Sequence, residues 1–172
     1  MTVRKATYLD IPEILPVLDA ARGIMRASGN LGQWVGGYPS EEAIRTDIQS
    51  GVGYVVLEDK GLLVGYFAFI PSPEPTYACI YGGNWLDDSL PYHVIHRIGS
   101  TPWSHGVFSA ILQYCFEREN NIRIDTHRDN HIMQHLLERH SFSYCGIIYL
   151  VSGDERLAYQ RIQTFTAPSS AD

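Results

Sequence analysis

The sequence has few cysteines, no long apolar run and no cluster of basic residues, and each of these scarcities excludes a class of protein. Its three cysteines, Cys79, Cys115 and Cys145, are far apart among apolar or aromatic neighbours. We therefore expect reduced, buried thiols rather than a disulfide framework. Apolar stretches such as residues 62–70 are far shorter than the roughly 20 residues that cross a bilayer. With no apolar signal segment near the N-terminus, we expect a soluble, cytoplasmic protein with no membrane partner.

The charge balance is acidic, with 13 Lys and Arg against 19 Asp and Glu, a formal net charge of −6. Without a basic patch, nucleic acid is not expected as a partner. Apolar residues make up 45% and charged residues 19%, which is ordinary globular usage. A chain of 172 residues suits one domain. We expect this domain over residues 1–166, followed by a flexible tail at 167–172.

Hydrophobic patterning predicts alternating helices and strands. The side chains of Phe108, Ile111, Leu112, Cys115 and Phe116 follow the spacing of a helix lying on a sheet. Other helices are expected from residue 10, over residues 40–50 and from residue 129 or 130, with a glycine-rich interruption at 28–39. Strands are expected at residues 2–7, 53–58, 62–70, 77–80, 92–98, 122–126, 144–151 and 156–162.

This order of elements, together with the segment "IDTHRDNHIMQHLLERHSFSYCGIIYL", resembles the GNAT family of acetyl-CoA-dependent N-acetyltransferases. In that family an Asn after the fifth strand opens a helix that ends near a Gly-Phe pair. Asn130 and Phe142 match these positions, while Ser141 replaces the usual Gly. The resemblance implies an α/β (α+β) fold with a mixed, mostly antiparallel sheet of six or seven strands. Helices would cover both faces, and a V-shaped gap would separate strands 4 and 5.

The resemblance also implies acetyl-CoA as cosubstrate, with its pyrophosphate held by a Q/RxxGxG/A loop before a helix. The matching stretch is "WSHGVFS", in which only Gly106 keeps a signature residue; Trp103 and Phe108 replace the others. Backbone N–H groups at a helix N-terminus bind anions whatever the side chains, although Phe108 would crowd the approach. The implied phosphate-binding residues are Ser104, His105, Gly106, Val107, Phe108 and Ser109.

Pantetheine in this family lies between strands 4 and 5 as if it were an added strand. Carried over, that position is beside Ile98, Gly99 and Ser100, with Thr126, His127 and Asn130 on the opposite wall. The Tyr that often protonates the CoA thiolate corresponds to Leu137, so the sequence assigns no general acid.

Aminolysis of a thioester needs a neutral amine, and histidine is suited to accept its proton. His96, just before the implied cofactor strand, is our first choice of base and His127 the second. Either ring has a structural alternative: His96 as a bonded strand residue, and His127 as a turn residue paired with Asp125 or Asp129. His131 and His135 have a chelating spacing, but a third ligand such as His127 or Glu138 would have to converge with them. No Cys or HExxH pattern supports this, so no metal is expected.

The loop between the first two expected helices is the candidate for acceptor recognition, because loops carry variable specificity. Trp34 either stacks on the substrate or fills the core beneath the loop. The candidate acceptor-binding residues of this loop are Asn30, Gln33, Trp34 and Tyr38.

Three functions are compatible with the sequence. The first is an N-acetyltransferase acting on a primary amine of a small molecule or peptide. The second is a catalytically degenerate CoA-binding module, favoured by the altered signature positions. The third is a structural or dimerising domain that keeps only the fold, with a homodimer as its assembly.

Overall fold

The computed structural model describes residues 1–164, so the tail expected at 167–172 lies outside the described residues. The strands are β1 (Thr2–Lys5), β2 (Gly53–Leu57), β3 (Leu63–Pro71), β4 (His93–Ser100), β5 (Asn121–Thr126), β6 (Ser143–Tyr149) and β7 (Glu155–Ile162). The α-helices are α1 (Ile11–Ala27), α2 (Glu41–Gln49), α3 (Val107–Phe116) and α4 (His131–Arg139). None of the described helices is long and apolar enough to span a bilayer.

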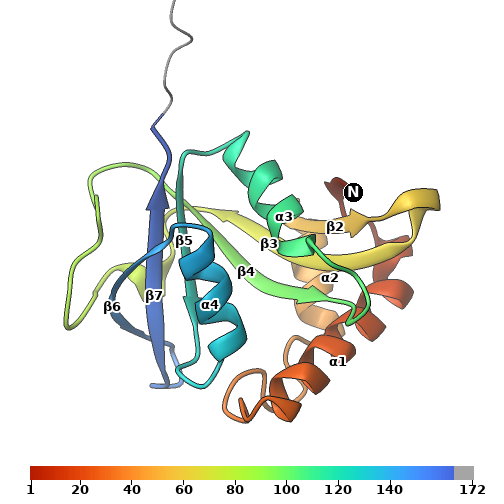
Figure 1. Cartoon of the computed structure of the whole chain (residues 1–172), viewed down its shortest axis with the longest axis horizontal. Coiled ribbons are helices and arrows are strands. Elements are labelled where there is room, and N and C mark those ends of the chain that lie inside the picture. Colours follow the sequence, from red (N-terminus) through yellow and green to blue (C-terminus); the bar gives the residue numbers. More distant parts are fainter. Residues whose placement is uncertain (165–172) are drawn as a thin grey trace, which may run out of the picture.

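The strands form one sheet in the order β1-β2-β3-β4-β5-β7-β6 (Figure 1). Every neighbouring pair is antiparallel except β4 and β5, which run parallel. The prediction of a mixed, mostly antiparallel sheet of six or seven strands is confirmed.

Helices cover both faces of the sheet because strand residues alternate in direction. Tyr54 and Phe67 point to one face, where they pack with residues of α3 and with Leu137 of α4. Val55 and Tyr66, their chain neighbours, point to the other face and pack with α1 and α2. Each face therefore has its own core.

The long connection between β3 and β4 covers the β5-β7-β6 half of the sheet, on the α1 and α2 side (Figure 1). Tyr77 and Trp85 of this connection are buried there. The strand expected at residues 77–80 is absent; a 3-10 helix at Pro75–Tyr77 and a bend followed by irregular chain take its place. The prolines before it cannot donate to a strand ladder, and Pro75 favours a turn.

The absence of this strand also decides which cysteines are buried. Cys115 and Cys145 are buried as expected, and burial raises the pKa of both thiols. Cys79 is exposed, because it lies in the irregular connection rather than in a strand packed on the core.

β4 and β5 separate soon after they meet. Their pairing consists of His93 with Ile122 and Val94 with Arg123. Beyond this point β4 stays paired to β3 as far as Ser100, and β5 stays paired to β7 as far as Thr126. The two strands thus diverge toward their C-terminal ends, and the predicted V-shaped gap between them is confirmed.

Candidate active site

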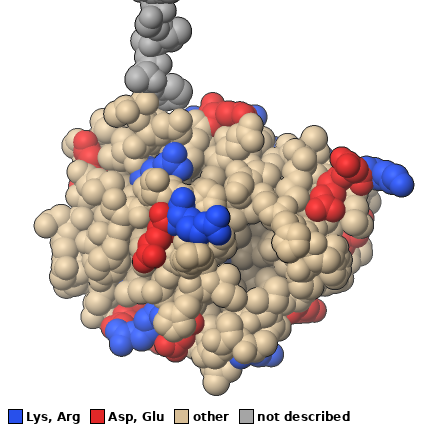
Figure 2. All heavy atoms as spheres, in the orientation of Figure 1, with Lys and Arg blue, Asp and Glu red and all other residues tan. Residues whose placement is uncertain are grey.

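The gap between β4 and β5 opens into a cleft of about 330 Å³. Its walls come from the two strands, the start of α4, the loop before α2 and the turn between β6 and β7. Figure 2 shows a hollow in the middle of the molecular face, walled mainly by uncharged residues. The volume suits a small ligand rather than a macromolecular surface.

His96 of β4 lines this cleft between two carboxylates. Its Nε2 lies 3.7 Å from Glu74 Oε2, and its Nδ1 lies 3.6 Å from Asp125 Oδ2. Both distances are slightly longer than a hydrogen bond, as is common for catalytic groups without bound substrate. The ring is 21% exposed, so a substrate in the cleft can reach it.

The two carboxylates are themselves fixed. The Tyr77 hydroxyl donates to Asp125 Oδ2 over 2.6 Å. Burial and the adjacent Asp125 raise the pKa of Tyr77, so the phenol remains a donor. The neighbouring His96 ring, opposed by burial, lowers the pKa of Glu74 to about 2. Glu74 is therefore an anion at neutral pH.

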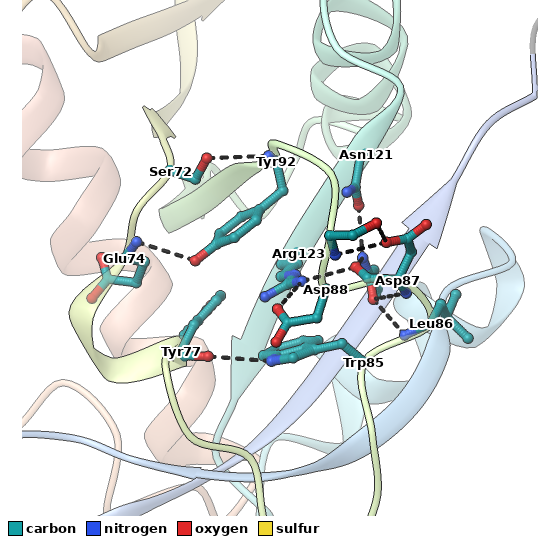
Figure 3. Close-up of polar contacts among 12 residues, drawn as sticks. Ser72, Glu74, Tyr77, Trp85, Leu86, Asp87, Asp88, Tyr92, Asn121 and Arg123 are labelled. Atoms are coloured by element: carbon teal, nitrogen blue, oxygen red, sulfur yellow. Dashed lines mark hydrogen bonds and ion pairs between the residues drawn. The ribbon is translucent and has the colours of Figure 1, made fainter.

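Behind these groups, the fully buried guanidinium of Arg123 lies between two aromatic rings (Figure 3). Its Cζ is 4.0 Å from the ring centre of Trp85 and 3.8 Å from that of Tyr92. Its Nη2 donates to the Asp87 carbonyl and to Asp88 Oδ1, at 3.0 and 2.9 Å. Two ring faces and two oxygens thus offset the cost of burying this cation.

The same two aromatic residues hold the segment that carries the carboxylates. The Glu74 N–H donates to the Tyr92 hydroxyl at 3.1 Å, and Trp85 Nε1 donates to the Tyr77 carbonyl at 3.2 Å (Figure 3). Arg123 therefore anchors the connection that places Glu74 and Tyr77 beside His96.

Gln33 joins two walls of the cleft, the loop before α2 and the start of α4. Its Oε1 accepts hydrogen bonds from Asn30 Nδ2 and Asn130 Nδ2, both at 2.9 Å. Asn130 is also the N-cap of α4, where its Oδ1 accepts from the Met133 N–H. Asn30 is fully buried and Gln33 lines the cleft. The amide side chains of the predicted acceptor loop thus bond this loop to the start of α4.

Trp34 packs in the α1 core, which is one of its two expected roles, and it also lines the cleft. Tyr38 lines the cleft as well, and its hydroxyl accepts from Arg97 at 2.8 Å. Arg97 lies at a bulge in β4 with a positive φ of 54° and forms a bidentate pair with the buried Asp47. This ion pair holds the end of β4 against α2.

His127 has the structural alternative that the sequence left open. Its Nδ1 accepts from the Asp129 N–H at 3.1 Å and fixes the turn into α4. Its Nε2 lies so close to Gly32 that a Cβ there would be 2.7 Å away. Burial and the nearby Arg156 lower the pKa of His127, which suits a neutral ring that accepts this N–H.

The residues expected to bind the cofactor lie at the end of β4, where it has separated from β5, and at the start of α3. Ile98 lines the cleft, and Gly99 packs against α1 so closely that a Cβ would be 3.0 Å from Leu18. Gly106 is the N-cap of α3 with a φ of 80°. The Ala110 N–H makes the first bond of the helix, to Gly106, so the N–H groups of residues 107–109 precede the ladder.

Phe108 points into the core, as its place in the apolar stripe of the helix predicted. It is 7% exposed, packs in the core and meets the His140 ring edge to face at 5.2 Å. Ser104, one turn earlier, has a buried hydroxyl with no partner in the described residues. No group of three or more His, Cys, Asp or Glu side chains within residues 1–164 is arranged to hold a metal.

A GNAT-family acetyltransferase structure from Streptococcus agalactiae is 35% identical to this chain, with a TM-score of 0.87. The match covers 95% of this chain and 96% of that one. The chain belongs to the GNAT family. The resemblance read from the sequence is thereby confirmed. Protein-family models and curated protein sequences give no match.

More distant structures share the fold. The ribosomal-protein-alanine N-acetyltransferase from Brucella melitensis is 18% identical, over 95% of this chain and 100% of that one, with a TM-score of 0.57. The NatC complex bound to Gag peptide and CoA contains a chain that is 13% identical, over 95% and 98%, with a TM-score of 0.59.

The sequence did not assign a place in this GNAT cleft to its charged residues Arg97, Asp125, Asp154 and Arg156, nor to Glu74, which contacts His96. The position of Asp125 could have been predicted from the sequence, because Asp125 follows the inward-facing Ile124 on a strand and so points to the other face, on the His96 side. The position of Glu74 could not, since Glu74 reaches His96 from an irregular, proline-rich connection.

The Glu74 pKa predicts an acid-sensitive contribution to stability. With a folded pKa of about 2 against the ordinary 4.5, this contribution is complete above pH 4.5 and is lost as the pH falls toward 2. Denaturant unfolding of wild type and Glu74→Gln between pH 6 and 2 should show a steeper acid loss in wild type. His96→Asn should reduce the same loss; parallel curves for wild type and Glu74→Gln would contradict the assignment.

Proposed function

We propose that this protein transfers an acetyl group from acetyl-CoA to a primary amine of a small molecule or peptide, in the cleft between β4 and β5. The observation that carries the proposal is the position of His96, held between Glu74 and Asp125 where the strands part. Membership of an acetyltransferase family supports the reaction, and the CoA named in the NatC structure supports the donor.

The residues present suit CoA. Pantetheine would run beside Ile98, Gly99 and Ser100, where β4 has left β5. The phosphates would take the free N–H groups at the start of α3, from His105 to Ser109. A Cβ at Gly106 would meet nothing within 4 Å, so this backbone is open to a ligand. The unpartnered Ser104 hydroxyl is a further donor at this position.

The bound cofactor supplies a thioester, whose carbonyl carbon is the acceptor of the amine. His96 takes one proton from the acceptor ammonium, directly or through a water, and the neutral amine then forms the C–N bond. The C–S bond breaks with release of the CoA thiolate, and the new amide nitrogen gives up its second proton to solvent. Glu74 and Asp125 stand at opposite ring nitrogens, so the positive charge gained by His96 faces two anions.

No protein acid is assigned to the thiolate, which takes its proton from solvent. Leu137, at the usual Tyr position, is fully buried in the core beneath α4. The Tyr92 hydroxyl accepts a hydrogen bond from the Glu74 N–H, and its ring packs against the Arg123 guanidinium. The remaining tyrosine candidates, Tyr144 and Tyr149, are on β6, away from the parting strands.

A CoA-binding module without turnover is the second candidate, because Trp103, Phe108 and Leu137 replace three signature residues. Two of these replacements point into the core, and they leave the cleft and its histidine in place. Release of free CoA thiol with a panel of amines separates the two functions, since a binding module would release none.

Gly106→Val should weaken binding of acetyl-CoA far more than a matched glycine replacement. A Val at positive φ strains the backbone and also places a side chain against the proposed phosphate site. Gly61 is the control, because it has the same φ of 80° and equally open surroundings, in the turn between β2 and β3. Calorimetry should show raised Kd only for Gly106→Val. Equal Kd values for both variants would show that the CoA phosphates do not bind at this turn.

His96→Ala should lower kcat/KM by about 10²- to 10⁴-fold while the Kd of acetyl-CoA stays nearly unchanged, because the variant lacks only the base. His135→Ala, at an exposed histidine of α4, should match wild type. Full turnover of His96→Ala would show that His96 is not the base.

A further inference from the structure

Arg156 of β7 is a buried cation at the far wall of the cleft. The residue is 7% exposed and lines the cleft. Its Nη1 donates to the Glu155 carbonyl at 2.9 Å, and it forms no ion pair within residues 1–164. The nearby carboxylates are otherwise engaged: Glu155 pairs with Arg128, and Asp154 accepts from the Ser152 hydroxyl at 2.8 Å.

Two other arginines near the cleft, the partly buried Arg97 and the buried Arg123, differ from Arg156. Arg97 has a bidentate carboxylate and a tyrosine hydroxyl, and Arg123 has two aromatic rings, a carbonyl and Asp88. Since a buried charge is costly unless it is paired, Arg156 is the cation of this cleft that lacks a counterion. Its uncompensated charge also contributes, after burial, to lowering the pKa of His127.

Arg156 shares one face of the sheet with the proposed base. Asp125 pairs across the sheet with Ala158, and Arg156 lies two residues before Ala158, so its side chain points the same way. Ala158 packs on the side of the β3–β4 connection, whereas α3 packs on the opposite face. Arg156 is therefore on the His96 side, away from the helix start assigned to the phosphates.

We propose that the acceptor is an amino carboxylate, a small molecule with a primary amine for His96 and a carboxylate for Arg156. This inference rests on the proposed acetyl transfer. A guanidinium presents paired N–H donors that match a carboxylate, and charge-assisted bonds of this kind are strong. Met25, Val35 and Leu150 also line the cleft and offer an apolar surface to the rest of the acceptor. A peptide bearing an amide in place of this carboxylate would leave Arg156 unpaired.

The test uses three matched series of acceptors with acetyl-CoA: amino acids, the corresponding amino acid amides, and the corresponding amines without the carboxyl group. Release of CoA thiol gives kcat and KM for each. For wild type, the KM of the amino acids should be about 10- to 100-fold lower than that of the amides, as expected for a charged hydrogen-bond pair. Arg156→Gln should bring the ratio near one, and Arg156→Lys should retain part of it.

Arg139→Gln, at an exposed arginine of α4, is the matched control and should keep the full preference. A thermal shift with acetyl-CoA verifies that each variant is folded and binds the donor. Equal KM values for acids and amides in wild type would overturn the inference and leave acetyl transfer standing, and so would an undiminished preference in Arg156→Gln. Absence of CoA release with all three series would overturn the proposed function itself, and the inference with it.

Discussion

The separation of β4 from β5 is the constraint on which the rest of the structure depends. Two residue pairs hold the strands together at one end, and each strand then remains bonded only to its outer neighbour. Backbone that leaves a ladder needs other partners or a ligand. The gap thus leaves one edge of β4 unpaired and opens the cleft, whose lining residues lie around it.

Three polar anchors keep the gap open from outside. The Arg97–Asp47 pair holds the end of β4 to α2, and Gln33 bonds the first loop to the cap of α4. Arg123, between two rings, fixes the connection that carries Glu74 (Figure 3). Each anchor is buried or partly buried, where polar contacts are strong when satisfied and costly when broken. The cleft therefore has walls that do not depend on a ligand for their position.

Much of the fold followed from the sequence, because helix and strand periodicity are local properties and the segment around Asn130 is specific to the family. The expected strand at 77–80 was wrong, since Tyr77 is buried by a tertiary contact of an irregular segment rather than by strand alternation. The site was predicted less completely. His96 and the loop around Trp34 were indicated, but Glu74 approaches His96, and Arg156 reaches the cleft, only through the folded arrangement of distant segments. No local sequence pattern predicts these contacts between distant segments.

A crystal structure of the protein with CoA tests the central claim most directly, namely that the parting of β4 and β5 forms the reaction cleft. The account predicts pantetheine density along Ile98 to Ser100, phosphates at the N-terminus of α3, and the sulfur atom on the path toward His96. CoA bound elsewhere on the molecule, or a pairing of β4 with β5 that continues through Ser100 and Thr126 and closes the gap, would contradict it.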